Sequence, residues 1–275
     1  MAAGRRLVGV ALSLVLGIVV LGGCDYPPNT RYVHVVFADT TVTKDVVYRS
    51  TITHEGVPID LKLDIYEPAG DTAVTRPAVM WMFGGAWAVG TKEDMAPYAI
   101  DSARRGYVGI TVQYRIRVGG AFSDLAGAAY DAYDDAIAAA QWLQANAATY
   151  RIDPDVIAAG GWSAGGINAW HMGVLPGRRG PATSPIVGVV AIAAAPMVKA
   201  RAGAPTVIAF SGTADGTVKY AGVELACEQT KSVGNQCQLV TYEGANHYIV
   251  DSQRADIQAR AARFLKDKVL RGRGY

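Results

Sequence analysis

The feature that most constrains the fold is an apolar run that breaks at two glycines and leads into a serine. Residues 156–161 are β-prone, Ser163 follows between small residues, and a helix-compatible segment begins at Ile167. The pattern Gly161-x-Ser163-x-Gly165 is typical of a nucleophile elbow, in which a strand turns so sharply into a helix that only small flanking residues fit. The pentapeptide alone is a weak signal in a chain with 31 glycines, and its strand–turn–helix context strengthens it.

A serine at such a turn becomes a nucleophile only when a general base and an orienting acid can reach it. Downstream of Ser163 the chain has two histidines, His171 and His247, and one aspartate, Asp215, lies between Ser163 and His247. Asp215 and His247 each follow a β-prone run, 206–210 and 237–242. Parallel strands gather their functional groups at this end, so we predict a Ser163–His247–Asp215 triad.

The separate features also have plainer interpretations. An Asp-Gly pair after a strand is ordinary turn chemistry, and a histidine in a polar loop is often a surface residue. His171 lies two turns into the helix expected after Ser163, so we interpret it as a packing or surface histidine. His34 and His54 precede the main sheet pattern and are interpreted as structural.

Acyl transfer also needs N–H donors for the developing oxyanion. The buried-strand pattern at 77–83 runs into Gly84 and Gly85, where missing side chains allow backbone N–H groups to approach a ligand. The N–H of Ala164, at the start of the next helix, is the other candidate donor. The alternative for Gly84 and Gly85 is a simple glycine turn between a strand and a helix.

Periodicity along the chain indicates one α/β domain. We expect strands at 46–54, 59–66, 78–83, 107–113, 156–161, 187–193, 206–210 and 237–242. After the first hairpin they alternate with helical patterns, including 124–147 and 252–270, which favours a mostly parallel sheet with helices on both faces. The acidic run Asp131, Asp134 and Asp135 in the longer helix is interpreted as a solvated face with capping charge.

The N-terminus has the composition of a secretory signal. Arg5 and Arg6 precede a 15-residue apolar run, 7–21, which is short for a membrane span and is followed by Leu21-Gly22-Gly23-Cys24. A cysteine directly after small residues resembles a bacterial lipobox, which implies cleavage before Cys24 and lipid attachment to its thiol. The alternatives are an ordinary signal peptide and an uncleaved anchor. We therefore expect a signal peptide at 1–23, a tether and N-terminal extension at 24–45, the catalytic domain at 46–275, and an extracytoplasmic location on a bacterial cell membrane.

Two further cysteines, Cys227 and Cys237, are separated by nine residues, and we expect them to pair in an oxidising compartment. No His or acidic cluster shares their spacing, so we predict no metal site. Residues 24–275 carry 24 basic and 24 acidic residues, and no dinucleotide or phosphate-binding motif is present. Nothing in the sequence therefore indicates nucleic-acid binding.

The segments 63–68, 81–87, 151–157, the elbow, 212–215 and 244–247 together resemble the α/β-hydrolase carboxylesterases related to the hormone-sensitive-lipase and feruloyl/acetylxylan-esterase families. The similarity runs from about Leu61 to the last helix. It implies an α/β-hydrolase fold with an eight-stranded sheet, Ser163 as nucleophile, His247 as base and Asp215 as the orienting acid. Gly84, Gly85 and Ala164 would then surround the oxyanion.

Two departures from the family pattern affect the site. Phe83 stands where the family motif usually begins with histidine. The connection from the strand near 186–193 to the next strand, near Thr206, is short, which predicts little or no cap and a site open to bulky or polymer-attached esters. Trp87, Trp162, Trp170 and Tyr248 are candidates to line that site, and the alternative for each is plain packing beside the elbow.

The sequence thus predicts a lipid-anchored serine carboxylesterase that acts on small or polymer-linked esters and needs no cofactor. One alternative is an amidase or peptidase on the same scaffold. The other is a non-catalytic, hydrolase-like envelope lipoprotein, which only Phe83 favours.

Overall fold

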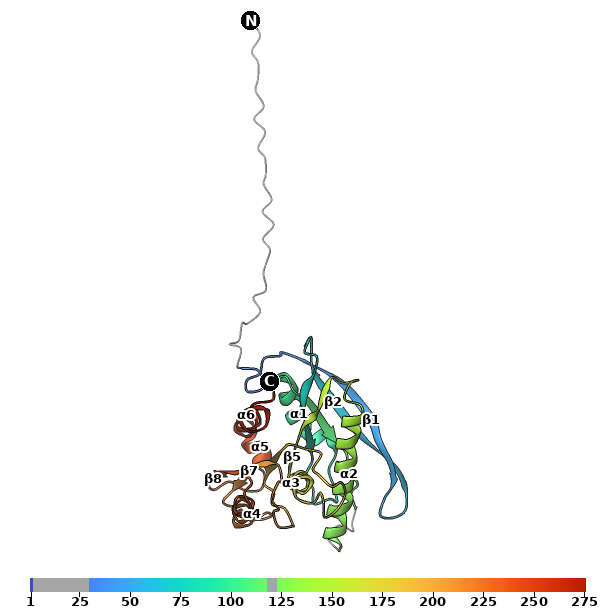
Figure 1. The fold of residues 1–275 in the computed structure, drawn as a ribbon, viewed down its shortest axis with the longest axis vertical. Helices are drawn as coiled ribbons and strands as arrows, with labels where there is room; N and C mark the ends of the chain where they lie inside the picture. The colour runs from blue at the N-terminus through green and yellow to red at the C-terminus, as the bar shows by residue number, and fades with distance from the viewer. Residues whose placement is uncertain (2–29, 118–122) are drawn as a thin grey trace.

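The structure is a computed structural model that describes Met1, residues 30–117 and residues 123–275. The described chain forms one eight-stranded sheet with helices on both faces (Figure 1). The strands are β1 Thr40–Ile52, β2 Pro58–Pro68, β3 Arg76–Met82, β4 Val108–Val112, β5 Ile152–Trp162, β6 Gly188–Ile192, β7 Thr206–Gly212 and β8 Cys237–Tyr242. The helices are α1 Ala96–Arg104, α2 Leu125–Ala145, α3 Ala164–Val174, α4 Tyr220–Ser232, α5 Ile249–Ser252 and α6 Arg254–Phe264, with a 3₁₀ turn η1 at Lys92–Met95 and a π-helical stretch η2 at Leu265–Leu270.

The strand order is β1-β2-β4-β3-β5-β6-β7-β8. β1, β2 and β4 pair antiparallel, and every pair from β4–β3 to β7–β8 is parallel. Helices α2, α3 and α4 lie along one face, and α1 and α6 along the other (Figure 1). The predicted α/β class and mostly parallel sheet are confirmed, and each of the eight predicted strands has its counterpart.

Strands β3, β4 and β6 are buried along their whole length, because helices cover both of their faces. This explains why they read in the sequence as continuous apolar runs. The first strand differs, since β1 begins at Thr40, before the expected start at residue 46. Its early residues are mostly exposed and polar, so they carry no apolar run, and pairing with β2 from Thr40↔Pro68 onward defines them as strand. The sheet thus includes residues 40–45, which belong to the predicted tether and N-terminal extension.

Residues 30–37, which we name the N-terminal strap, also pack on the domain. Arg31 forms a two-pronged ion pair with Asp71 at 2.9 and 2.6 Å, and the buried ring of Tyr32 meets Tyr107 and Tyr275 edge to face. Tyr275 in turn donates to Asp153 Oδ2 at 2.6 Å, at the start of β5. Arg31, which was expected within the tether, is therefore fixed to the domain at the N-terminal end of the parallel strands.

The structure corrects the interpretation of the acidic run in α2. Asp135 is fully buried, accepts bonds from Arg49 at 2.7 Å and from Arg115 Nε at 2.8 Å, and is not part of a solvated face. Asp134 does lie on the outer side, paired with the half-exposed Arg179. Adjacent aspartates on a helix point about 100° apart, so one reaches the interior while its neighbour faces solvent. The capping charge comes from Asp124, whose carboxylate accepts the N–H of Gly127.

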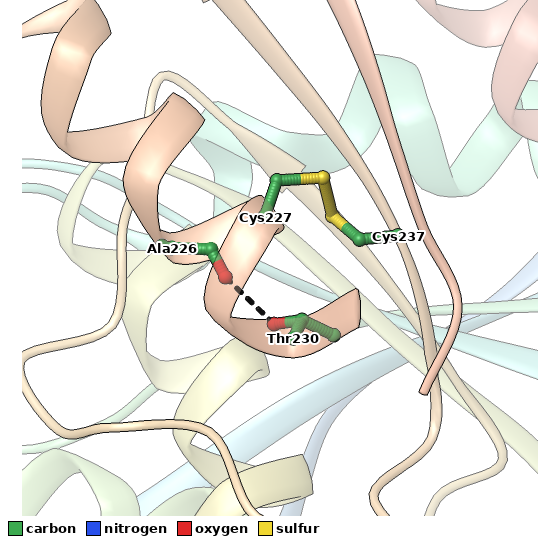
Figure 2. The surroundings of a disulfide bond; sticks show 4 residues. All are labelled: Ala226, Cys227, Thr230 and Cys237. Carbon is green, nitrogen blue, oxygen red and sulfur yellow. Dashed lines mark hydrogen bonds between the residues drawn. A yellow bond between two sulfur atoms is a disulfide. The ribbon is translucent and has the colours of Figure 1, made fainter. Parts of the chain in front are cut away.

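The predicted disulfide is present. Cys227 on α4 and Cys237 at the start of β8 are bonded, so helix and strand are joined beside the Ala226–Thr230 hydrogen bond of α4 (Figure 2). The expected last helix, 252–270, is divided into α6 and η2. Among the described residues, no helix is both long and apolar enough for a membrane crossing. Cys24 and, apart from Met1, the predicted signal peptide lie outside the described residues.

Candidate active site

The candidate active site is built on the turn between β5 and α3. Ser163 links the two elements with φ +52° and ψ −121°, a left-handed conformation that non-glycine residues rarely adopt. Its N–H donates to the carbonyl of Ile192 at 2.8 Å, and its own carbonyl accepts from Ile167 at 2.9 Å. The first bond ties the serine to β6 and the second begins helix α3. The backbone is therefore fixed on both sides of the serine.

Close approach of α3 to β3 explains the glycine after the serine. A Cβ on Gly165 would lie 2.1 Å from the carbonyl oxygen of Met82 and 2.4 Å from that of Phe83. No side chain fits at these distances. The first turn of α3 therefore lies directly against the end of β3, where the Gly84–Gly85 segment begins.

The structure brings Ser163, His247 and Asp215 together from three separate turns. His247 Nε2 lies 2.9 Å from Ser163 Oγ, and His247 Nδ1 lies 2.8 Å from Asp215 Oδ2. An ionised carboxylate only accepts hydrogen bonds, so Nδ1 carries the proton and Nε2 is free to accept from the serine hydroxyl. All three side chains are buried, which strengthens these interactions.

The acid and the base are both oriented by further contacts. The second carboxylate oxygen of Asp215, Oδ1, accepts the N–H groups of Thr217 and Val218 at 2.8 and 2.9 Å. The indole N–H of Trp162 donates to the carbonyl of His247 at 3.1 Å, and its ring lies 5.4 Å from the imidazole. These bonds come from the turn after β7 and from the end of β5, so the sheet itself sets the geometry of the three groups.

The loop after β3 carries the predicted oxyanion donors. Gly85, Ala86 and Trp87 have φ values of +113°, +53° and +58°, so three consecutive residues are left-handed. Within the described residues, no backbone hydrogen bond uses the N–H of Gly84 or Gly85. Ala164 is the first residue of α3, and the N–H groups of a helix's first turn have no partner inside the helix. These N–H groups are therefore available to a ligand beside Ser163.

Phe83, the departure from the family motif, is a packed residue. Its ring is buried and stacked on Tyr114 with centroids 4.1 Å apart, and its carbonyl accepts the Tyr114 hydroxyl at 2.7 Å. The start of the loop is thus fixed by an aromatic pair at the position where a histidine is usual.

The aromatic residues expected to line the site divide into two groups. Trp87 and Trp170 are buried, at 3% and 0% exposure, and pack in the interior. Trp162 is partly exposed and contacts the rings of both His247 and Tyr248, and Tyr248 is 60% exposed. Of these four residues, Trp162 and Tyr248 are therefore the ones placed to meet a substrate, because both reach the surface and contact the ring of His247, whereas Trp87 and Trp170 are covered.

His171, the other histidine downstream of the serine, is buried in α3, and its Nε2 accepts the N–H of Met197 at 3.0 Å. Burial lowers the pKa of His171 to about 4. This imidazole is therefore neutral at physiological pH and belongs to the packing of the helix, as expected.

Two cavities lie near the site without including the triad. One of about 500 Å³ borders Phe83, Tyr114 and the β1–β2 hairpin, and one of about 300 Å³ borders Trp162 and Arg254. The connection from β6 to β7 contains no helix or strand, in agreement with the predicted absence of a cap. In the described part of the chain, no three His, Cys, Asp or Glu side chains are grouped so as to hold a metal ion.

One residue of this site was missed in the sequence. Asn168 is fully buried on α3 and accepts the indole N–H of Trp87 at 2.9 Å. The available signal was an amide side chain five residues after Ser163, in the otherwise apolar run 164–170.

Comparison with known proteins agrees with this geometry. The BD-FAE family profile matches residues 63–184, which include the loop after β3 and the elbow. Carboxylesterase 1C of Rattus norvegicus is 32% identical over 148 residues, 51% of this chain and 27% of the relative. Carboxylesterase 3 of Homo sapiens is 36% identical over 109 residues, 38% of this chain and 19% of the relative. The chain thus matches about a quarter of the length of these curated relatives.

Solved structures match over most of the chain. The native esterase Est2 of the planctomycete Thermogutta terrifontis has a TM-score of 0.67 and 28% identity, and the match covers 86% of this chain and 93% of Est2. The same enzyme phosphoramylated by tabun gives a TM-score of 0.69, 28% identity, and coverage of 84% and 95%. Together with the eight-stranded sheet, these similarities show that the chain has the α/β-hydrolase fold found in esterases.

Proposed function

We propose that the protein is a serine carboxylesterase that works through an acyl-enzyme. The observation that carries the proposal is the continuous hydrogen-bonded chain from Ser163 Oγ through His247 to Asp215, with steps of 2.9 and 2.8 Å. These distances are within the range required for proton transfer between a nucleophile and its base. The similarity to carboxylesterases and to Est2 supports the same reaction class.

In this mechanism, Ser163 Oγ attacks the ester carbonyl carbon while His247 Nε2 takes the hydroxyl proton. The carbonyl oxygen becomes negative and is stabilised by the N–H groups of Ala164 and of Gly84 or Gly85. Collapse of the tetrahedral intermediate breaks the bond to the alcohol oxygen, which leaves with the proton from His247. Water then repeats the sequence on the acyl-serine and releases the acid. Asp215 stabilises the imidazolium in both halves.

Short acyl groups are the first substrates to test, because similar structures include Est2 with bound propionate and butyrate. The connection between β6 and β7 contains no helix or strand that could form a cap, which suits a bulky or polymeric ester.

The test is a series of p-nitrophenyl esters of increasing acyl length, run on wild type, Ser163→Ala and the exposed-serine control Ser232→Ala. We expect hydrolysis by wild type and by Ser232→Ala, and a loss of at least about 10³-fold in Ser163→Ala. A fluorophosphonate probe should label wild type and not Ser163→Ala. Cleavage of peptide amides without any esterase activity would instead indicate an amidase. Failure of folded wild type to react with esters, amides and the probe would refute catalysis.

We further propose that Cys24 is lipidated after signal-peptide removal and that the enzyme is held on the outer side of a bacterial membrane. The motif Leu21-Gly22-Gly23-Cys24 behind a charged start and a short apolar run supports this location. A Cys227–Cys237 disulfide is consistent with an oxidising compartment. Expression of the full chain in a bacterium should give a membrane-bound protein, and Cys24→Ala should be released or remain as an unprocessed precursor. Mass spectrometry that finds an unmodified Cys24 in the mature protein would rule out lipidation.

A further inference from the structure

The loop that carries the candidate oxyanion donors has backbone conformations that are unfavourable without contacts from the rest of the protein. Gly85, Ala86 and Trp87 are left-handed in succession, and two of them have side chains. Such conformations persist only where surrounding contacts determine them. The groups that hold Trp87 therefore decide where the N–H groups of Gly84 and Gly85 lie.

Trp87 is held at both its backbone and its side chain. Its carbonyl accepts the N–H of Arg117 at 2.7 Å, and its indole N–H donates to Asn168 Oδ1 at 2.9 Å. Both Trp87 and Asn168 are buried, with 3% and 0% exposure, so water does not compete for this bond.

Asn168 lies on α3, the helix that begins directly after Ser163. The indole–amide bond therefore joins the two parts of the proposed oxyanion site. One part is the loop with Gly84 and Gly85, and the other is the helix N-terminus with Ala164. No other side chain-to-side chain hydrogen bond between this loop and α3 is present in the described residues.

In the described part of the chain, the side-chain amide of Asn168 is hydrogen-bonded only through its oxygen. Asn168 Nδ2 is buried and has no partner among the described residues. A half-satisfied buried amide is unfavourable for stability, and an apolar residue of similar size would avoid that cost. The contribution of Asn168 is thus concentrated in one acceptor atom, which is bound to Trp87.

We propose that Trp87 and Asn168 are positioning residues that set the distance between the Gly84–Gly85 N–H groups and the Ala164 N–H, and thereby the fit of the oxyanion. This inference rests on the proposed esterase function. The proposal concerns only the N–H donors for the oxyanion. Removal of the Trp87–Asn168 bond should therefore leave the Ser163–His247–Asp215 hydrogen bonds intact.

The experiment compares Trp87→Phe, Asn168→Leu and the double variant with wild type. The matched control is Trp170→Phe on the same helix, because the buried indole N–H of Trp170 has no partner among the described residues. Both single variants should lower kcat by about 10- to 100-fold, with KM within twofold and the pH profile of kcat/KM unchanged. Trp170→Phe should stay within threefold of wild type in kcat.

The double variant separates positioning from general stability. Removing both partners eliminates the unpaired buried groups, so its thermal midpoint should return towards that of wild type. Its kcat, measured per site titrated with a fluorophosphonate, should remain as low as in the single variants. Recovery of kcat together with the midpoint, or single variants no slower than Trp170→Phe, would overturn the inference. A wild type without esterase activity would instead refute the proposed function, and the same assay shows which has failed.

Discussion

His171 provides a quantitative prediction about acid stability. Its imidazole is 1% exposed, and burial lowers its pKa from 6.5 to about 4. In the unfolded chain the group titrates near 6.5, so between pH 6.5 and 4 the unfolded state binds a proton that the native state does not. Stability therefore falls as pH is lowered through this range, and the contribution is fully present above pH 6.5.

The magnitude follows from the two pKa values. Each tenfold change in proton concentration between them is worth about 1.4 kcal/mol, so His171 should remove about 3 kcal/mol of unfolding free energy between pH 7.5 and pH 4. His171→Gln keeps an oxygen that can accept the N–H of Met197 and does not titrate. The variant should therefore lose about 3 kcal/mol less than wild type over the same interval, whatever carboxylates contribute to both proteins.

The assay is urea denaturation of wild type, His171→Gln and His34→Gln at 25 °C and at several pH values from 7.5 to 4. His34 is exposed, so its variant should follow wild type. Parallel curves for wild type and His171→Gln would refute the reasoning. At pH 7.5, His171→Gln should hydrolyse esters within threefold of wild type, since this histidine has no place in the proposed mechanism.

Three further comparisons of variants test the framework around the site. Replacing both Cys227 and Cys237 by alanine opens a loop of sequence separation 10 and should reduce the free energy of unfolding by about 2.7 kcal/mol, read from the urea midpoint; unchanged midpoints would contradict the chain-entropy estimate. Asp135→Ala removes the buried carboxylate that Arg49 and Arg115 share and should cost about 3 kcal/mol, whereas Asp134→Ala, from a partly exposed pair, should cost no more than about 1 kcal/mol; equal losses would refute the distinction. Gly165→Ala forces a Cβ to within 2.1 Å of a β3 carbonyl oxygen and should cost about 3 kcal/mol or more, with lower fluorophosphonate labelling. Normal labelling and stability would show that α3 can move.

Strands covered on both faces could be predicted from the sequence, because their apolar runs reflect burial directly. The first residues of β1 could not, since an exposed edge strand has no apolar run and is defined by its partner. The burial of Asp135 could not be predicted from the sequence either. Its partner Arg49 is 86 residues away, so only the folded chain reveals that this carboxylate faces inward.

At the site, the sequence indicated which groups follow which strands, and the parallel sheet then places Ser163, Asp215 and His247 at one edge. The contacts behind those groups were not predictable. The sequence leaves open whether Trp87 lines the site or packs beside the elbow, and the structure gives it a left-handed backbone and a buried indole that is bound to Asn168. Neither the backbone conformation nor the pairing across 81 residues has a local signature.

The N-terminal strap bears on how the proposed esterase would be presented to its surroundings. It is fixed beside Tyr275 and the start of β5, whereas Ser163 follows the last residue of that 11-residue strand, roughly 33 Å away. The seven residues from Cys24 to Thr30 are joined by six Cα–Cα steps and span at most about 22 Å when fully extended. In a protein attached through Cys24, the strap would therefore lie within about 22 Å of the lipid anchor, and Ser163 would lie at the opposite end of β5. Such a protein would act on esters displayed by neighbouring polymers or arriving from solution, and the lipids of its own membrane would lie behind it.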